Sequence, residues 1–168
     1  MITRPLEAHE IVPRLWMGSR PEPGPALATM GFDVLALCAM EYQPTTEWYP
    51  GIVIGRIRLD DAELSAGQAL QAFQLAAQLA KMIKMKKRVL VTCAQGRNRS
   101  GLITALTMVA LTGCSGFEAC HAVRVRRQSP FGPALMNHHY MTAICEIPAA
   151  QVRGVLTQQA AQEARLAG

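Results

Sequence analysis

The most informative stretch of the chain, residues 88–111, reads RVLVTCAQGRNRSGLITALTMVAL. An apolar run typical of a buried strand leads into a short polar loop, and the loop leads directly into an apolar helix. Such a loop directs several backbone N–H groups at one point, and the helix N-terminus adds about half a positive charge. Gly96 lets the backbone turn and approach a ligand closely. The stretch therefore predicts an anion-binding site.

Two residues of this loop carry reactive chemistry. Cys93 opens it and Arg99 closes it. Inward-facing amides, a helix dipole and a guanidinium all stabilise negative charge, so we expect Cys93 to be a nucleophilic thiolate at neutral pH. The Arg99 fork can grip two oxygens of a phosphoryl group during transfer. The hydroxyl of Ser100 could donate a hydrogen bond to the sulfur and favour its departure.

The pattern C-x-x-G-x-x-R-S-G between an apolar strand and an apolar helix resembles the signature of the protein tyrosine phosphatase superfamily. The similarity is greatest to the small dual-specificity phosphatases, which read roughly VLVHC-x-x-G-x-x-R-S. Other parts of the chain also resemble the family. IVPRLWMGSRPEP (11–23) resembles the family's opening strand and turn, and GFDVLALC (31–38) resembles one of its buried strands. IRLDDAE (57–63) resembles its general-acid loop. VRVRRQSPFGPALMNHHYMTAI (123–144) resembles its C-terminal helices.

The resemblance implies a role for each residue of the site. Cys93 is the nucleophile, Arg99 the phosphate clamp and Ser100 the aid to the leaving thiolate. The resemblance also implies a general acid, and Asp60 and Asp61 lie 33 and 32 residues before Cys93, as the family's acid loop does. Asp61 is slightly better placed, and one of the two could instead be an acid favoured by a helix dipole. The phosphate cradle should consist of the amides of Ala94, Gln95, Gly96, Arg97, Asn98 and Arg99.

The chain departs from the family at Thr92, where the family has histidine. Threonine can donate one hydrogen bond but carries no charge, so we expect a less stabilised thiolate and lower activity. Arg97 either adds a cation that favours highly anionic substrates or points into solvent. Asn98 stands at the same place in some RNA-phosphatase relatives. Asn137, by resemblance, helps to order the loop or an attacking water.

Several residues near these motifs leave alternatives open. His121, His138 and His139 are expected in surface or capping roles rather than as metal ligands. Cys38 is expected to be a buried thiol, although some relatives form a protective disulfide with the nucleophile. Tyr42 or Trp48, from a segment expected to line one wall, could stack on a substrate ring. Two positions are possible for Arg124, Arg126 and Arg127: the rim of the site or a solvated face of a helix.

The pattern of elements predicts a single α/β domain with a central, mostly parallel, twisted sheet flanked by helices. Residues 1–150 form the expected catalytic domain, and residues 151–168 a helical extension or frayed tail. Strands are expected at 11–19 (or a hairpin there), 32–38, 52–59 and 88–92. Helices are expected from Ser65 to about Met85, over 100–111, from Ser115 to about Gln128 and over 134–147, with Ser65–Gln68 and Ser115–Glu118 as capping boxes.

The composition of the chain indicates where the protein acts and which cofactors and partners to expect. The chain has 168 residues, a formal net charge of +5 and five cysteines without the spacing of a disulfide framework or a zinc site. No apolar stretch is long enough to span a membrane, and no signal peptide is recognisable. We expect a cytoplasmic protein with mostly buried thiols and neither metal nor cofactor. Expected partners are a phosphorylated protein or another anionic phosphate monoester, a phosphate or sulfate ion in the loop, and nucleic acid only as a phosphorylated substrate.

These features predict a metal-independent cysteine phosphatase that acts on phosphotyrosine, phosphoserine, phosphothreonine or another phosphate ester through a phosphocysteine intermediate. The alternative is a phosphate-binding pseudophosphatase with negligible catalysis, favoured by Thr92 alone. Sulfur transfer or arsenate reduction uses a similar loop. The position of the loop past the middle of the chain and the Arg-Ser pair that closes it argue against both.

Overall fold

A computed structural model describes residues 5–146 and 149–167 of the chain. Strands lie at β1 (Ala8–Val12), β2 (Leu15–Gly18), β3 (Val34–Ala39), β4 (Val53–Leu59) and β5 (Val89–Thr92). Helices are α1 (Ala26–Thr29), the 3-10 turn η1 (Thr46–Trp48), α2 (Ala66–Lys84), α3 (Arg99–Thr112), α4 (Gly116–Arg126), α5 (His138–Glu146) and α6 (Ala149–Leu166). The expected strands and helices are present except for the first turn of the helix expected over 134–147, and the first strand region is a hairpin of β1 and β2.

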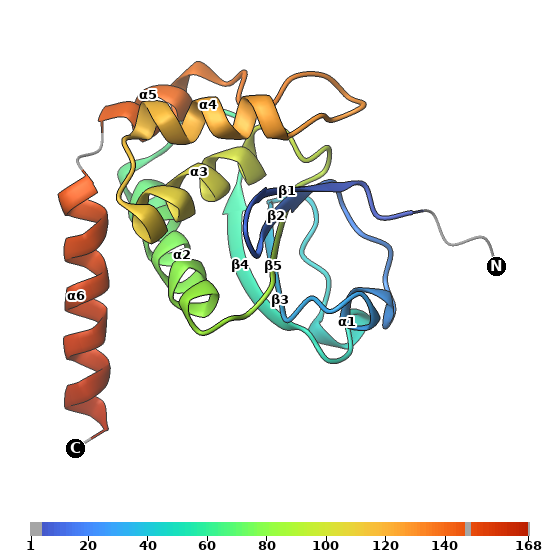
Figure 1. Cartoon of the computed structure of the whole chain (residues 1–168), viewed down its shortest axis with the longest axis horizontal. Coiled ribbons are helices and arrows are strands. Elements are labelled where there is room, and N and C mark those ends of the chain that lie inside the picture. Colours follow the sequence, from blue (N-terminus) through green and yellow to red (C-terminus); the bar gives the residue numbers. More distant parts are fainter. Residues whose placement is uncertain (1–4, 147–148, 168) are drawn as a thin grey trace.

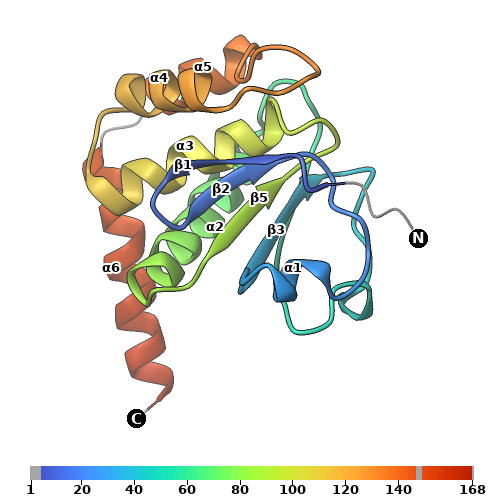
Figure 2. The ribbon, with the colours of Figure 1, turned by 45° about the vertical axis from the view of Figure 1, so that its right-hand side comes forward.

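The sheet has five strands in the order β1-β2-β5-β3-β4. Strand β1 pairs antiparallel with β2, whereas β2, β5, β3 and β4 run parallel. Helices α2 to α5 lie on one side of this sheet and α1 on the other (Figure 1; Figure 2). The prediction of a mostly parallel sheet flanked by helices in one α/β domain is confirmed.

Both faces of the central strands are covered, which explains their continuous apolar runs. In β3, Val34, Ala36 and Cys38 face the larger core beneath the helices, and Leu35 and Leu37 face the smaller core with Leu27 and Phe32. Strand β5 follows the same alternation. This register turns the Cys93 side chain toward the helical side, in the larger core.

Two helices begin at the predicted capping boxes. Ser65 accepts a hydrogen bond from the Gln68 amide at 3.1 Å and Ser115 accepts one from the Glu118 amide at 3.2 Å. The side chains of Gln68 and Glu118 reciprocate at 3.0 and 2.8 Å. Helix α2 ends at Lys84, as expected, and α4 ends at Arg126, two residues before the expected end.

The prediction of a helix from residue 134 is wrong, because α5 begins at His138. Leu135 has a φ of +51°, which a right-handed helix does not allow. The side-chain oxygen of Asn137 accepts hydrogen bonds from the amides of His139 (3.0 Å) and Tyr140 (3.3 Å), so Asn137 caps the helix. Residues 134–137 are thus a loop, and Ile147 lies outside the described residues.

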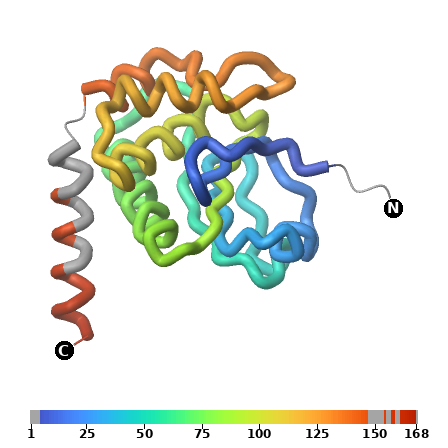
Figure 3. The backbone as a smooth tube through the Cα atoms, in the orientation of Figure 1, coloured from blue at the N-terminus to red at the C-terminus, as the bar shows by residue number. Residues whose placement is uncertain are grey.

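The C-terminal segment contains helix α6 (Ala149–Leu166). Helix α6 runs along one side of the domain, beyond α2 (Figure 3). It contacts α2 and α3, and Lys81 of α2 pairs with Glu163 at 2.6 Å. Among the described residues, no helix combines the length and apolarity that a membrane crossing requires.

Candidate active site

Three neighbouring parallel strands end at the same edge of the sheet. Cys93 follows β5, Glu41 follows β3 shortly after its end, and Asp61 follows β4. The carboxyl ends of parallel strands are the usual position of ligand sites in such sheets. These three side chains line one cavity of about 320 Å³ together with Ala94, Gln95, Arg97, Asn98 and Arg99.

The loop of residues 93–99 has its carbonyl groups bound on the outside. The Gly96 carbonyl accepts from Arg127 Nε at 2.9 Å, the Gln95 carbonyl from Ser129 Oγ at 3.3 Å, and the Arg97 carbonyl from the Leu135 amide at 3.2 Å. In a trans peptide the following N–H points the opposite way. The amides of Gly96, Arg97 and Asn98 are therefore directed inward, as an anion cradle requires.

Gly96 is required for this course of the loop. It has a φ of +62°. A Cβ atom there would overlap the carbonyl group of Gly18 and lie 2.6 Å from Arg127 Nη2. The loop is thus pressed against the end of β2 on one side and a buried guanidinium on the other.

Cys93 lies at the bottom of the cavity, 4% exposed. Its sulfur is 3.2 Å from the Oγ of the buried Ser100, the contact expected for a hydroxyl that stabilises a leaving thiolate. Neighbouring Cys38 is a fully buried free thiol. Burial, followed by the charge of Cys93, raises the pKa of Cys38.

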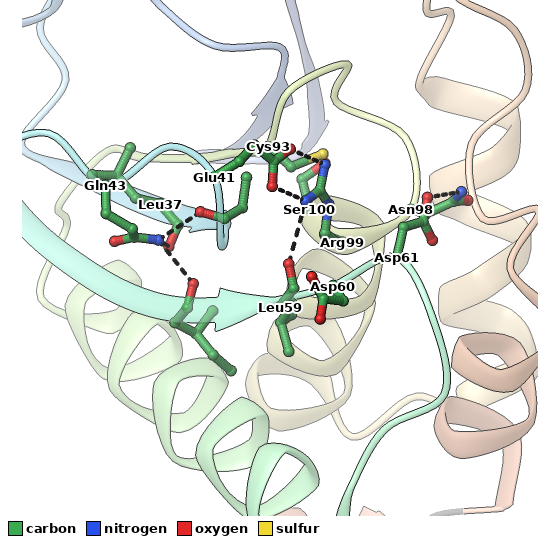
Figure 4. A network of polar contacts seen from close by, with 12 residues as sticks. Leu37, Glu41, Gln43, Leu59, Asp60, Asp61, Cys93, Asn98, Arg99 and Ser100 are labelled. Carbon is green, nitrogen blue, oxygen red and sulfur yellow. Dashed lines mark hydrogen bonds and ion pairs between the residues drawn. The ribbon is translucent and has the colours of Figure 1, made fainter.

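The guanidinium of Arg99 is held in a bidentate ion pair by Glu41 (Figure 4). The second of the two bonds, from Nη2 to Oε1, measures 2.6 Å, and Nη1 also donates to the Leu59 carbonyl at 3.3 Å. Partial burial lowers the pKa of Arg99, but the bonds to Glu41 and the charge of Cys93 outweigh it and raise that pKa overall.

The segment that carries Glu41 is anchored by Gln43. The amide nitrogen of Gln43 lies within hydrogen-bonding distance of the carbonyls of Leu37 (3.1 Å), Ala39 (2.9 Å) and Ile57 (3.0 Å), across β3 and β4. Of the segment 41–50, Glu41 reaches the cavity. Tyr42 and Trp48, considered for stacking on a substrate, do not line it; Arg20 lies over the Tyr42 ring at 4.5 Å.

The two candidate acids are placed differently. Asp61 lines the cavity, and its two carboxylate oxygens accept hydrogen bonds from Asn98 Nδ2 (2.7 Å) and Asn137 Nδ2 (2.8 Å). Figure 4 shows Asp61 turned toward Asn98. Asp60 is not among the residues that line the cavity, and its backbone carbonyl accepts from the Tyr140 hydroxyl. Burial, and then the charge of Asp61, raises the pKa of Tyr140.

Arg127 is a buried structural residue, so both sequence-based readings of it, a rim cation and a solvated helix face, are wrong. It is 1% exposed and lies behind the loop, with Nε on the Gly96 carbonyl. Its guanidinium forms an ion pair with Glu7 and lies 2.8 Å from His9 Nδ1. Glu7, just before β1, and His9, within β1, thus hold Arg127 in place, and Arg127 supports the loop from behind.

Thr92 and Arg97 both take structural partners. The Thr92 hydroxyl donates to the Ala36 carbonyl at 3.1 Å, so it ties β5 to β3. Arg97 lines the cavity and its Nε donates to the Pro133 carbonyl at 3.0 Å. His138 and His139 lie near the surface, with ring centroids 4.0 Å apart. Within the described residues, no three His, Cys, Asp or Glu side chains form a group that could hold a metal.

A second, more open hollow of about 440 Å³ adjoins the first. Asp61 and Asn98 belong to the walls of both. The rest of its wall is formed by Ala62, Glu63, Met136, Asn137, His138 and His139. A ligand in the first cavity can therefore extend past Asp61 into open space.

Comparison with solved structures identifies the fold. A mouse protein assigned to the dual specificity phosphatases, solved with zinc tungstate, superimposes with a TM-score of 0.70 at 18% identity over 95% of this chain and 94% of that one. Human DUSP28 gives 0.65 at 17% identity over 92% and 97%. P. aeruginosa TpbA gives 0.67 at 14% identity over 90% and 91%, and it was also solved in complex with pTyr. The chain therefore has the fold of the dual-specificity and tyrosine phosphatases.

Sequence comparison adds no relative. No protein-family description matches the chain, and no curated protein matches it. The likeness therefore rests on structure, at identities below 20%.

The segment 41–50 was expected to line one wall, and Glu41 does so. Sequence reasoning missed the ion pair of Glu41 with Arg99, the link from Asn98 to Asp61 and the burial of Arg127. Glu41 and Asp61 follow the ends of successive predicted strands, a pattern that can indicate a shared site at one edge of a parallel sheet. Arg127 gave no such signal, because it is one of several arginines near the end of a helix.

Proposed function

We propose that the protein is a metal-independent cysteine phosphatase that hydrolyses phosphate monoesters at Cys93. The arrangement of one loop carries this proposal. The Cys93 sulfur sits beside Ser100 Oγ at the bottom of a cavity, with inward-directed amides around it and the Arg99 guanidinium on its wall. A tetrahedral dianion is the ligand that such a set of donors fits.

In the first step, the Cys93 thiolate attacks phosphorus and the bond from phosphorus to the leaving oxygen breaks. Asp61, which shares the cavity, gives its proton to that oxygen. In the second step, water attacks the phosphocysteine, Asp61 takes the proton of the water, and the sulfur departs with the hydrogen bond of Ser100. Inorganic phosphate and the starting enzyme result. Asp61 is proposed as the acid in preference to Asp60, because only Asp61 lines the cavity.

The residues that line the cavity support a proposal for the substrate class. Apart from Ala94, the described residues that line the cavity are polar or charged and none is aromatic, so the phosphoryl group rather than a ring provides the main binding contacts. The leaving oxygen lies on the Asp61 side, and the group that it carries extends into the adjoining hollow. We propose phosphorylated protein side chains, phosphotyrosine among them, as substrates, and a cytoplasmic location for the protein.

The test measures hydrolysis of p-nitrophenyl phosphate and of phenyl phosphate with EDTA present. Cys93→Ser should abolish turnover of both. Asp61→Asn should lower kcat about a hundredfold on phenyl phosphate and less on p-nitrophenyl phosphate, because nitrophenolate leaves without a proton far more readily than phenolate. Asp60→Asn is the matched control and should stay within about twofold of wild type. If Asp60→Asn instead lowers kcat as much as is expected for Asp61→Asn, Asp60 rather than Asp61 is the general acid.

The second candidate function is phosphate binding without catalysis, and Thr92 is the observation that favours it. In that case the folded protein binds vanadate or phosphate, and turnover is absent at every pH. Turnover that Cys93→Ser abolishes would exclude it.

A further inference from the structure

Helices α4 and α5 approach each other backbone to backbone. A Cβ atom on Gly116, at the start of α4, would overlap the carbonyl oxygen of Ile144 and lie 2.9 Å from the Cα of Cys145, near the end of α5. Only a residue without a side chain allows that contact. The closeness is therefore built into the sequence at Gly116.

This contact brings two cysteines together. Cys120 lies four residues after Gly116 and so on the same face of α4. The Cα–Cβ bond of a helical residue tilts toward the helix N-terminus, so the Cys120 side chain is directed back toward Gly116 and the adjacent backbone of Cys145. Burial, followed by the nearby Cys145, raises the pKa of Cys120. Cys120 is 6% exposed, whereas Cys145 is exposed to solvent. One thiol is accessible to a reagent, and its neighbour lies behind it.

We propose that Cys120 and Cys145 are a disulfide-forming pair that joins α4 to α5 when the protein meets an oxidising disulfide such as oxidised glutathione. The proposal goes beyond the phosphatase activity and does not depend on it. It involves neither the catalytic thiol nor Cys38.

The chemistry balances in two exchanges. The Cys145 thiolate attacks one sulfur of the glutathione disulfide, forms a mixed disulfide and releases one glutathione thiolate. The Cys120 thiolate then attacks the Cys145 sulfur and releases the second glutathione. The protein loses two hydrogens and is oxidised, and one glutathione disulfide is reduced to two thiols. The second exchange should be faster at alkaline pH, because the attacking species is the Cys120 thiolate and burial opposes its formation.

A disulfide between Cys120 and Cys145 would enclose the chain segment between them, and this segment supports the active-site residues. Between the two cysteines lie Arg127, Leu135 and Asn137, which bond to Gly96, Arg97 and Asp61 respectively. The disulfide would fix both ends of this supporting segment. Since a cross-link over a loop of this size restricts the unfolded chain, the oxidised protein should melt roughly 5–10 °C higher than the reduced one.

The experiment uses the full-length chain with Cys93→Ser, so that oxidation of the nucleophile cannot interfere. After incubation with oxidised glutathione at mildly alkaline pH, the intact mass should fall by two hydrogens, and peptide mapping should recover Cys120 linked to Cys145. Thermal melting should show the rise, and a reducing agent should reverse it. Cys145→Ser, at an exposed position, should abolish both changes, and Cys114→Ser, the matched control, should leave both intact.

Two results would overturn the proposal. One is a stable glutathione adduct on Cys145 with no link to Cys120. The other is a disulfide between any other pair of cysteines while Cys120 and Cys145 remain free thiols. Neither result bears on the phosphatase activity, which is measured separately on the reduced wild-type chain.

Discussion

Arg99 binds a carboxylate at the place where the proposed reaction needs a phosphate. Glu41 takes both terminal nitrogens of the guanidinium, and the hydrogen bond from Arg99 holds the pKa of Glu41 below its usual range, despite some opposing burial. Glu41 therefore stays ionised at neutral pH. A phosphate dianion that enters the cavity must share or replace this partner and also meets its negative charge.

Removing that charge should strengthen anion binding. Glu41→Gln should lower the KM for p-nitrophenyl phosphate and the inhibition constant of vanadate by roughly three- to tenfold, since one competing partner and one repulsive charge are lost. Steady-state kinetics with vanadate titration measures this. Glu47→Gln, which removes the same charge on the exposed turn η1, should leave both values unchanged. Weaker vanadate binding in Glu41→Gln would show that Glu41 chiefly orients Arg99.

Among the elements, the loop of residues 93–99 depends most on one backbone conformation. Gly96→Ala should reduce phosphate or vanadate binding at least tenfold and destabilise the fold by about 1–3 kcal/mol, because the positive φ and the overlap with Gly18 cannot both be relieved. Anion titration and urea unfolding measure the two effects.

Gly67 is the matched control for this substitution. It lies in the first turn of α2, where a Cβ atom would meet nothing closer than Ser65 Oγ at 4.0 Å. Gly67→Ala should therefore raise the stability by about 0.5–1 kcal/mol and leave anion binding unchanged. Equal effects of the two substitutions would contradict the special role of Gly96.

At the level of helices and strands, local signals predicted well where they were complete. The capping boxes at Ser65 and Ser115 and the apolar run of β3 gave the correct elements, because the groups that satisfy them lie within a few residues. The segment 134–137 looked helical by composition. Its backbone is instead fixed by distant partners. The Arg97 carbonyl accepts a hydrogen bond from the Leu135 amide, and the side-chain oxygen of Asn98 accepts from the amides of Met136 and Asn137.

The Glu7–Arg127 ion pair links two distant parts of the domain, the segment before β1 and the end of α4. Burial raises the pKa of Glu7, but the hydrogen bond and charge of Arg127 outweigh it, so that pKa lies below the ordinary value of 4.5. A carboxyl group whose pKa is lowered in the folded state stabilises the protein at pH values above the ordinary pKa of that group. That contribution is lost as the pH falls through the lowered pKa.

Glu7→Gln should therefore cost about 3 kcal/mol at neutral pH, because it leaves the buried Arg127 charge without its carboxylate. The difference from wild type should shrink below about pH 4, where Glu7 becomes protonated in the wild type as well. Urea unfolding at both pH values measures it, with Glu63→Gln at an exposed position as the control. A difference that is constant with pH would contradict the assignment.

The division into a catalytic domain of residues 1–150 and an extension of residues 151–168 stays a prediction. Helix α6 contacts α2 and α3, and none of its residues whose side chains the structure describes lines the active-site cavity. A chain that ends at residue 146 should keep its kcat within about twofold and lose a few degrees in Tm, to which the exposed Lys81–Glu163 pair contributes little. Loss of activity in a folded truncated chain would make α6 part of the catalytic unit.

The amino-acid sequence was enough to predict the α/β class, the strand–loop–helix around Cys93 and the contact of Cys93 with Ser100. Those features depend on periodicity, capping and glycine within about ten neighbouring residues. Glu41 on Arg99 and Glu7 on Arg127 join residues 58 and 120 positions apart in the chain, and the approach of α4 to the backbone of Cys145 depends on how two helices pack. Such pairs leave no local pattern, because it is the order and register of the strands and the packing of the helices that bring them together.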